Sequence, residues 1–385
     1  MLETADQSAS FAINLGLASD RSPQSPRDVH LPSGMKVVSA DNHFEITEDI
    51  FYDNFPNAMK DRAPRVWFDR YWHMGFPGGV EAFKPSGRLD DMMERINVRD
   101  GFDMAVRKAH MDAEGVSSEI VFPQSLFGLL RLQDLEAREL MYRIYNEYVA
   151  RLMRENPGRF YGVGVFSNWW DPARAEAAMQ QIMDLGLKTF MIPTLMKDVD
   201  GQEVSLASQR MERFWAVAAE AALPVNFHIG EDAAFGERGM HATYFMTTTS
   251  PFRKPLAQII FGGVLDRHPG LQIVFTEAGI NWVASFLQDA ELYYGSYGDI
   301  AEERPAHNPT HYWRNNCFAT FQLDRLGLEM IDYIGRDRVM WGADYPHTEG
   351  SFGVGWTVMQ DIVDRTSEAD ARNILGDTAR RVYQL

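Results

Sequence analysis

The chain has 385 residues, of which 45% are hydrophobic and 12% aromatic, and this composition is that of a globular protein with a large core. Asp and Glu number 54 against 37 Lys and Arg, a formal net charge of −17, and no dense basic run occurs, so binding to nucleic acid is not expected. The single cysteine, Cys317, excludes an intrachain disulfide framework and favours a reducing compartment, for which the cytoplasm is the default.

The first segment, residues 1–35, is expected to form an arm outside the main domain. It is rich in Ser, Pro and Asp and shows no sustained hydrophobic period. Such an arm is either disordered or packed on a neighbouring chain, which leaves a homodimer open. Residues 11–18 are too short and too mixed for a signal core or a membrane span, so neither export nor a membrane partner is expected.

A short apolar strand over residues 36–40 leads directly into Asp41, His43 and Glu45. Alternation along an extended chain directs these three side chains to the same side. That spacing suits metal ligation. An Asx turn with a solvated histidine would have the same residues, so this stretch alone leaves both interpretations open.

An irregular aromatic insertion is expected over residues 46–104, where prolines and glycines are interspersed with tryptophans, tyrosines and phenylalanines. So long a connection in a compact fold is usually a lid, a substrate-contacting loop or part of an interface. Its candidates for contact with a substrate are Trp72 and His73, although packing explains His73 as well. A second loop of this kind is expected over residues 231–251, with His241 as a third candidate.

Strand and helix signals alternate from residue 105 onward. Helices are expected over residues 106–114, 135–155, 173–185, 209–222 and 252–267, from residue 281, and over 326–334. Strands are expected over residues 118–122, 161–166, 189–192, 225–227, 273–276, 318–321 and 339–343, a loop over 293–314, and a helical tail. Together with the strand at 36–40, the alternation predicts an α/β fold, a closed (β/α)8 TIM barrel over residues 36–385 with inserted loops at the carboxyl ends of its strands.

Several of the expected strands end in residues that bind metals. His228 leaves the fifth strand, Glu277 the sixth, and Asp344 the eighth, with His347 three positions further on. Taken singly, each has a structural explanation, as a core histidine or as a carboxylate that caps a helix. Because the carboxyl ends of barrel strands share one rim, their combination with the first-strand residues favours a site. The expected metal ligands are Asp41, His43, His228, Glu277 and Asp344.

This donor set exceeds what one tetrahedral zinc ion needs. It fits either one metal with an additional catalytic acid or base, or two bridged metals. A bound divalent ion would make hydroxide available as a nucleophile, and the chain has no GxSxG motif and no context that activates Cys317. We therefore expect one or two divalent ions (Zn, Fe or Mn) as cofactor and a small molecule as substrate.

Four motifs stand out at the ends of the expected strands: SADNHFE at 39–45, LPVNFHIG at 223–230, FTEAGINWV at 275–283 and VMWGADYPH at 339–347. In this order they resemble the amidohydrolase-related family of the amidohydrolase superfamily, including its aminocarboxymuconate-semialdehyde decarboxylase-like members. The resemblance implies a (β/α)8 barrel with a metal held by Asp41, His43, His228 and Asp344. It also implies that Asp344 accepts a proton from the attacking water, with His347 contacting the substrate or a metal ligand.

Two positions depart from the family pattern. Asp41 stands where the best-known first motif, HxH, has a histidine, which makes the site harder and iron or manganese credible. Glu277 stands where the decarboxylase branch has a histidine after the sixth strand, so that Glu277 is a candidate to bind or bridge a second metal.

The leading expectation for function is a metal-dependent hydrolase, with Asp344 and His347 as catalytic residues, acting on a small aromatic or apolar substrate through metal-bound hydroxide. Two enzymatic alternatives remain open, a non-oxidative decarboxylase of a hydroxyaryl or related acid and a non-haem di-iron oxygenase. Outside enzymes, the chain could be a binding module built on the same barrel, because a fold does not fix a function.

Overall fold

The computed structural model describes residues 21–24, 29–76, 103–130, 132–166, 171–194, 196–198, 200–230, 242–243, 246–247, 252–300 and 304–385. Most of the expected arm, most of the loop at 231–251 with His241, and residues 77–102 of the expected insertion lie outside these ranges. Within the described ranges, no helix is long and apolar enough to cross a membrane.

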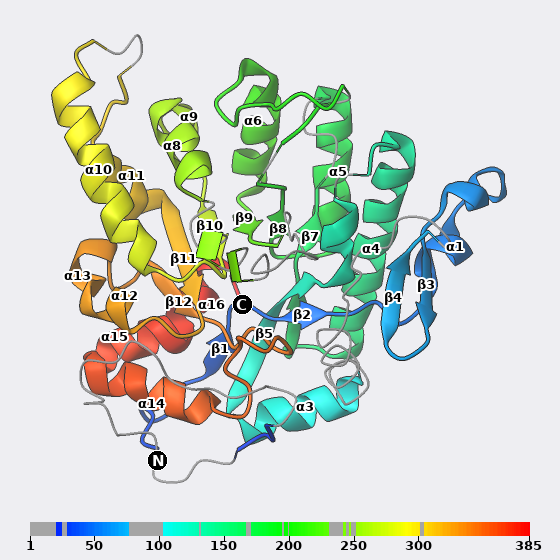
Figure 1. Cartoon of the computed structure of the whole chain (residues 1–385), viewed down its shortest axis with the longest axis horizontal. Coiled ribbons are helices and arrows are strands. Elements are labelled where there is room, and N and C mark those ends of the chain that lie inside the picture. The colour runs from blue at the N-terminus through cyan, green and yellow to red at the C-terminus, as the bar shows by residue number, and fades with distance from the viewer. Residues whose placement is uncertain are drawn as a thin grey trace.

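Parallel strands form the centre of the molecule (Figure 1). In chain order they are β1 (Val37–Ser39) with its continuation β2 (His43–Phe44), β5 (Val116–Pro123), β6 (Phe160–Gly162) with β7 (Gly164–Val165), β8 (Phe190–Met191), β9 (Val225–His228), β10 (Ile273–Thr276), β11 (Cys317–Phe321) and β12 (Val339–Trp341). Successive strands pair in parallel register from β7 through to β12, and β5 pairs in parallel with β1, β2 and β6. These strands are buried and consist largely of branched and aromatic residues, as expected where both faces of a sheet are covered.

The sheet closes between its last and first strands. The amide of Ala40 donates to the carbonyl of Trp341 at 2.9 Å, and the amide of Asp344 donates to the carbonyl of Asp41 at 2.8 Å. On the other side, Val163 links β6 and β7 into one strand, since its amide bonds Val121 of β5 while the next amide, of Gly164, bonds Thr189 beside β8. The chain is therefore the (β/α)8 barrel that the alternation predicts.

Helices surround the strands (Figure 1). They are α3 (Met104–Ala113), α4 (Leu135–Glu155), α5 (Pro172–Asp184), α6 (Glu212–Ala221), α8 (Arg253–Phe261), α9 (Val264–Arg267), α10 (Asn281–Tyr297), α11 (Pro309–Asn316), α12 (Arg325–Glu329), α13 (Ile331–Ile334), α14 (Gly355–Arg365), α15 (Glu368–Arg372) and α16 (Thr378–Val382), with the π-helical η6 (Asn373–Asp377) and the 3₁₀ segments η4 (Ser125–Leu129) and η5 (Gln209–Met211). Aspartates cap four of the described helices: the side chains of Asp103, Asp134, Asp171 and Asp324 accept backbone N–H groups in the first turns of α3, α4, α5 and α12. Local capping and the hydrophobic period thus explain where these helices lie.

The expectation of an irregular insertion is wrong for residues 50–75. This part contains α1 (Ile50–Asn54), η3 (Asn57–Arg62) and an antiparallel hairpin of β3 (Arg65–Phe68) and β4 (Trp72–Gly75). Cross-strand ring packing explains the hairpin, because Trp67 lies opposite His73 with ring centroids 5.2 Å apart and Phe68 opposite Trp72 at 5.3 Å. In Figure 1 the hairpin lies at the edge of the barrel, beyond α4.

The expectation of a loop over residues 293–314 is also wrong in part. Helix α10 continues to Tyr297, and α11 begins at Pro309. The side chain of Asn308 caps α11 by accepting the amide of His311, and proline is favoured at the first helical position. The Asn-Pro pair is therefore a helix start here rather than a loop signal.

Candidate metal centre

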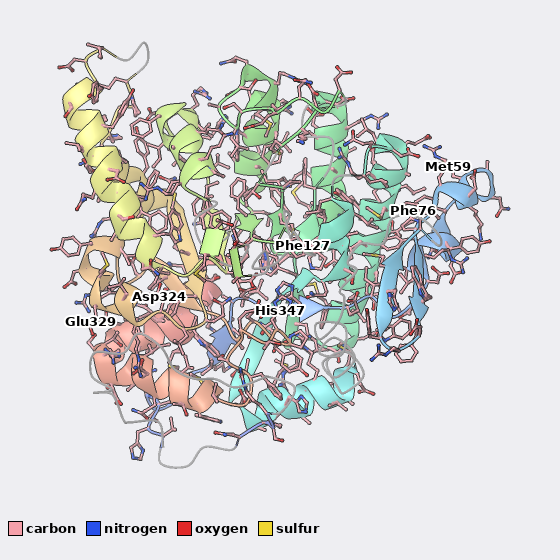
Figure 2. The ribbon with its side chains drawn as sticks, viewed as in Figure 1. Met59, Phe76, Phe127, Asp324, Glu329 and His347 are labelled. Atoms are coloured by element: carbon pink, nitrogen blue, oxygen red, sulfur yellow. The ribbon has the colours of Figure 1, made fainter. Side chains whose placement is uncertain are left out.

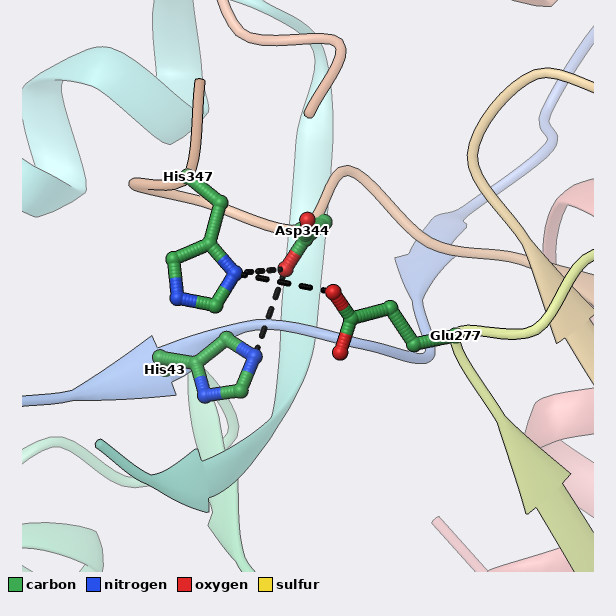
Figure 3. A group of neighbouring side chains, drawn as sticks. All are labelled: His43, Glu277, Asp344 and His347. Carbon is green, nitrogen blue, oxygen red and sulfur yellow. Dashed lines mark ion pairs between the residues drawn. The ribbon is translucent and has the colours of Figure 1, made fainter. Parts of the chain in front are cut away.

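Side chains from five loops and strand ends meet at the carboxyl rim of the barrel. Asp41 follows β1, His43 begins β2, His228 ends β9, Glu277 follows β10, and Asp344 follows β12. All five side chains are buried, although they are charged or polar. Figure 3 shows His43, Glu277 and Asp344 together with His347, which comes from the loop after Asp344. In Figure 2, His347 and Phe127 of η4 both lie near the centre of the view.

One group of potential ligands consists of His43, Glu277, Asp344 and His347, whose donor atoms all lie within 4.8 Å of one another. Asp344 is at its centre: its Oδ1 is 2.8 Å from Nδ1 of His347 and 3.2 Å from Nε2 of His43. Nδ1 of His347 is also 3.7 Å from Oε1 of Glu277 (Figure 3). The imidazoles of His43 and His347 are stacked, with centroids 4.2 Å apart.

A second group, Asp41, His43 and His228, shares His43 with the first. Oδ1 of Asp41 lies 3.2 Å from Nε2 of His228 and 3.8 Å from Nε2 of His43. Glu277 lies between the two groups, because its Oε2 is 3.4 Å from Nε2 of His228 while its Oε1 faces His347. The two carboxylate oxygens of Glu277 therefore face different histidines.

The backbone at two of these positions adopts an uncommon conformation. Glu277 has φ +74° and Asp344 has φ +55°, values that residues other than glycine rarely adopt. Such conformations cost about 1–3 kcal/mol each, and they persist where surrounding bonds enforce them. Here the amide of Glu277 donates to Oγ1 of Thr320 at 2.9 Å, and the amide of Asp344 donates to Asp41. Residues in this conformation cluster at functional sites, which supports a role for both carboxylates.

A close approach of backbone brings Asp41 beside the end of β12. Gly342 lies so near that a Cβ atom there would be 2.5 Å from Cβ of Asp41 and 2.9 Å from its backbone nitrogen. Only glycine leaves this space free. The glycine of the WGAD stretch thus helps to place Asp41 and Asp344 on the same rim.

Several neighbours fix the orientation of the donors. Nε2 of Gln322 donates to Oδ2 of Asp41 at 3.1 Å, which leaves Oδ1 turned toward the histidines. Nδ1 of His228 lies 2.7 Å from the carbonyl of Ile229, so this nitrogen is the donor and Nε2 is the free one when the ring is neutral. Nε2 of His347 lies 2.9 Å from Oε1 of Gln124, which in the same way directs Nδ1 to Asp344.

Aromatic side chains line the rim next to His228. The ring of Phe122 is centred 4.5 Å from that of His228, and the ring of Phe127 is 4.9 Å from it. An apolar wall next to charged groups lowers the local dielectric and strengthens their interactions. It also offers a flat ring-shaped ligand a surface on which to pack.

Burial shifts the proton affinities of the cluster. It lowers the pKa of His43 well below the usual value, assisted by the neighbouring cations His347 and His228. It raises the pKa of Asp344 well above the usual range, assisted by the charge of Glu277, and it raises that of Glu277 as well. For His347 burial acts in the opposite direction, but the pairing with Asp344 outweighs it and raises the pKa well above the ordinary value. Without a bound cation, the Asp344 and His347 pair therefore retains a proton at neutral pH.

The donor set fits a divalent metal ion. Nε2 of His43 and both carboxylate oxygens of Asp344 are buried, and none makes a hydrogen bond of good geometry to another described residue. Buried polar atoms without such partners are rare, and a cation would satisfy all three. A mixture of imidazole and carboxylate donors suits manganese, iron or zinc, in contrast to a thiolate set, which would select zinc more strongly.

The expected ligands Asp41, His43, His228, Glu277 and Asp344 all lie at this centre, and His347 joins them as a further potential ligand. Glu45 does not: its Oε2 accepts from Ser125 at 2.6 Å, and its Oε1 from the amide of Ile46. His73 is stacked on Trp67 and on Tyr71 inside the hairpin. Contact of Trp72, His73 and His241 with a substrate stays a prediction.

Sequence reasoning did not single out Gln124 and Gln322. Gln124 is the first residue after β5, and Gln322 is the first residue after β11. A polar residue directly after a buried strand is the signal that identified His228 and Glu277, and it would have found these two as well. Phe127 carries no such signal, because it lies in a helical turn further along the loop.

A parallel barrel with buried metal donors at its carboxyl rim defines a metal-dependent barrel enzyme. Comparison with known proteins agrees: the amidohydrolase family model matches residues 41–385, and the chain belongs to this family. The four motifs and the resemblance drawn from them are thereby confirmed.

Two relatives of this chain are decarboxylases. The gamma-resorcylate decarboxylase of Rhodococcus jostii is 24% identical over 79% of this chain and 93% of its own length. The 2-amino-3-carboxymuconate-6-semialdehyde decarboxylase of Dictyostelium discoideum is 22% identical over 61% of this chain, and the match spans only 64% of that relative.

Solved structures show the same fold. An amidohydrolase from Mycobacterium avium subsp. paratuberculosis superposes with a TM-score of 0.73 at 20% identity, covering 92% of this chain and 99% of its own. The 5-carboxyvanillate decarboxylase of Novosphingobium aromaticivorans, solved with manganese and 3-methoxy-4-hydroxy-5-nitrobenzoic acid, gives a TM-score of 0.66 at 18% identity over 94% of this chain and 100% of its own. At this identity the structures establish the fold alone.

Proposed function

We propose that this protein is a metal-dependent, non-oxidative decarboxylase of a hydroxyaryl or related carboxylic acid. The named relatives favour decarboxylation over the hydrolysis that the sequence first suggests, and one of them matches over nearly its whole length. The observation in the site that carries the proposal is the pair of the buried Asp344 and the partly exposed His347, whose Oδ1 and Nδ1 atoms lie 2.8 Å apart.

Decarboxylation of an aryl acid needs a proton donor at one carbon atom. The bond between the ring and the carboxylate breaks, carbon dioxide leaves, and the electron pair that stays on the ring carbon takes up one proton. A donor for this step must hold a proton at neutral pH in a site from which water is excluded. His347 is placed for this step, because its Nδ1 lies 2.8 Å from Asp344; burial lowers the pKa of the imidazole, but the charge of Asp344 outweighs it and raises this pKa well above the ordinary value. We assign His347, held by Asp344, as the acid that protonates the ring carbon.

His347 also places an imidazole near Glu277, the position where this chain departs from the decarboxylase pattern. The family resemblance implies a histidine after the sixth strand in the decarboxylase branch, and this chain has glutamate there. An imidazole nevertheless enters the same space from the loop after β12, where it stacks on His43 and faces Glu277 at 3.7 Å. The chain thus has an imidazole beside the donor cluster, held by a different loop.

Asp41, His43, His228 and Asp344 would hold the metal ion, with Glu277 beside them. A divalent ion bound there would act as a Lewis acid on an oxygen of the substrate and orient it. Phe122 and Phe127 would pack against the ring, since both line the rim next to His228. Manganese is the first ion to test, because the donors include hard carboxylates and because the related 5-carboxyvanillate decarboxylase was solved with it.

The test is direct. Purified protein is stripped of metal and reloaded separately with manganese, zinc or iron. Each preparation is incubated with hydroxybenzoic acids that carry a hydroxyl next to the carboxylate. Release of carbon dioxide together with the matching phenol would support the proposal. Turnover of esters, amides or lactones by the same preparations, without carbon dioxide from any acid, would restore the hydrolase as the better assignment.

The position of Glu277 favours a second candidate, oxygen chemistry at two iron ions. Its two carboxylate oxygens face His228 and His347 respectively, which is the arrangement of a carboxylate that bridges two metals. Elemental analysis of protein purified without oxygen separates the candidates. Two irons per chain and oxygen consumption that needs a reductant would favour the oxygenase, and one divalent ion per chain would favour the decarboxylase.

A further inference from the structure

A guanidinium group from the amino-terminal segment binds the loop that carries His347. Nη1 of Arg21 donates to the carbonyl of Gly350 at 2.7 Å and to that of Phe352 at 3.1 Å, and Nη2 donates to the carbonyl of Thr348 at 3.0 Å. More than 320 positions of sequence separate Arg21 from these acceptors. Three carbonyl oxygens of one short loop therefore converge on one side chain.

The loop is shaped to receive this side chain. At Gly353 the backbone has φ +78°, and a Cβ atom there would lie 2.5 Å from Cβ of Arg21. A residue with a side chain at position 353 would be strained and would also displace the arginine. The fit is thus specific on both sides of the contact.

Glu114, at the end of α3, holds the same two segments together. Its Oε1 accepts the amide of Gln24 at 3.3 Å and the amide of Gly353 at 2.9 Å. The Glu114 carboxylate also lies close enough to Arg21 for their charges to attract. Residues 21–24 are therefore held against the loop by two sets of contacts. Arg21 donates to carbonyls of the loop, and Glu114 accepts one amide from the segment and one from the loop.

The bound loop begins directly at the site. It turns back on itself, because the amide of Gly350 donates to the carbonyl of His347 and the amide of Ser351 to the carbonyl of Ala343. Thr348, the first acceptor of Arg21, is the residue after His347. A shift of these carbonyls would move the imidazole relative to Asp344.

We propose that Arg21 is a positioning residue of the site and that residues 21–24 form a strap that sets the His347 loop. The proposal rests on the function assigned above only for its catalytic consequence, since the contacts themselves do not depend on it. A guanidinium suits the task because its planar set of donors reaches several carbonyls at once, whereas the donors of an ammonium group radiate from one point.

The experiment uses the full-length, metal-loaded protein with Arg21→Ala. We expect kcat to fall roughly 10- to 100-fold with little change in KM, because small displacements of catalytic groups have effects of this size. Addition of a few millimolar guanidinium or methylguanidinium should restore part of the activity, since the cavity left by Arg21 can accept the free cation. Arg314→Ala is the matched control: Arg314 also donates to backbone carbonyls, those of Asp332 and Tyr333, but in the contact of α11 with α13.

Two readouts stand without any substrate. Hydrogen exchange of residues 347–354 should be faster in Arg21→Ala and slower again with guanidinium, and the visible spectrum of cobalt-loaded protein should change in parallel. Unchanged exchange, spectrum and turnover in Arg21→Ala would overturn the proposal, as would losses that guanidinium does not reverse. If wild-type protein releases no carbon dioxide, the proposed function fails, but exchange and spectrum still decide the role of Arg21.

Discussion

For single residues, the proposed decarboxylation assigns the proton transfer to His347, whose Nδ1 lies 2.8 Å from Asp344. His347→Gln keeps a polar side chain of similar size but cannot supply this proton. We expect kcat to fall by about 10²–10⁴, the range for loss of a general acid, while KM and metal content change little. Steady-state kinetics and metal analysis of the variant check this.

His268→Gln is the control for this substitution, because His268 also pairs with a carboxylate, that of Glu212 at 2.8 Å, but next to α9. Turnover of His347→Gln at the wild-type rate would show that the acid is another group.

Glu114 gives a prediction for the effect of pH on stability. Burial raises its pKa to about 7, although the amides of Gln24 and Gly353 favour the charged form. Because the folded-state pKa lies above the unfolded value, the stabilising contribution is complete below pH 4.5 and is lost as the pH rises to 7. A rise of this size corresponds to about 3 kcal/mol. Relative to wild type, Glu114→Gln should therefore gain about this much free energy of unfolding between pH 4.5 and pH 8.

Denaturant titrations at both pH values measure the gain. Glu155→Gln, at an exposed position on α4, should show little of it. Equal pH dependence in wild type and Glu114→Gln would mean that folding leaves the pKa of Glu114 unchanged.

At the scale of elements, one carboxylate joins the starts of two helices. Oδ1 of Asp324 accepts the amide of Gly327 in α12, while Oδ2 accepts the amides of Ile280 and Asn281 at the start of α10. Asp324 (labelled in Figure 2) is nearly buried, so its loss would leave several donors without partners. We expect Asp324→Ala to lower the free energy of unfolding by about 2–4 kcal/mol, more than a single helix cap contributes.

Asp103→Ala is the comparison, because Asp103 is exposed and caps only α3. It should cost about 1 kcal/mol. Equal losses for the two variants in denaturant titrations would contradict the joint role of Asp324.

At the scale of the whole molecule, the barrel gathers like charges that repel one another. Asp41, Glu277 and Asp344 lie within one buried cluster, so a cation bound there stabilises the folded chain. Removal of metal with a chelator should lower the thermal midpoint. Re-addition should raise the midpoint again, because the free energy of unfolding increases with the logarithm of the ion concentration, by about 2.7 kcal/mol at 100 times the Kd.

Differential scanning fluorimetry with manganese, zinc and iron measures the shift. His228→Ala should abolish metal retention and lose most of the shift while the barrel remains folded. A thermal midpoint that changes neither with the chelator nor with added metal would show that the cluster does not bind a divalent ion.

The barrel could be predicted from the order of the residues alone. Strand and helix periods, with turns between them, place all the barrel strands, because a strand buried on both faces leaves an apolar run that is visible in the chain. The polar residues that end those runs identified the five expected ligands for the same reason. The sequence did not reveal the hairpin of β3 and β4. Ring pairs across the hairpin hold its two strands together, and neither strand shows a clear hydrophobic period.

The way in which the donors are combined could not be predicted without the folded chain. That His347 faces Glu277, and that Gln124 and Gln322 orient His347 and Asp41, depends on loops from distant parts of the chain. The attachment of Arg21 to the loop after β12 is of the same kind. Sequence patterns report which residues a segment buries, whereas contacts between loops follow from where the closed barrel places the ends of its strands.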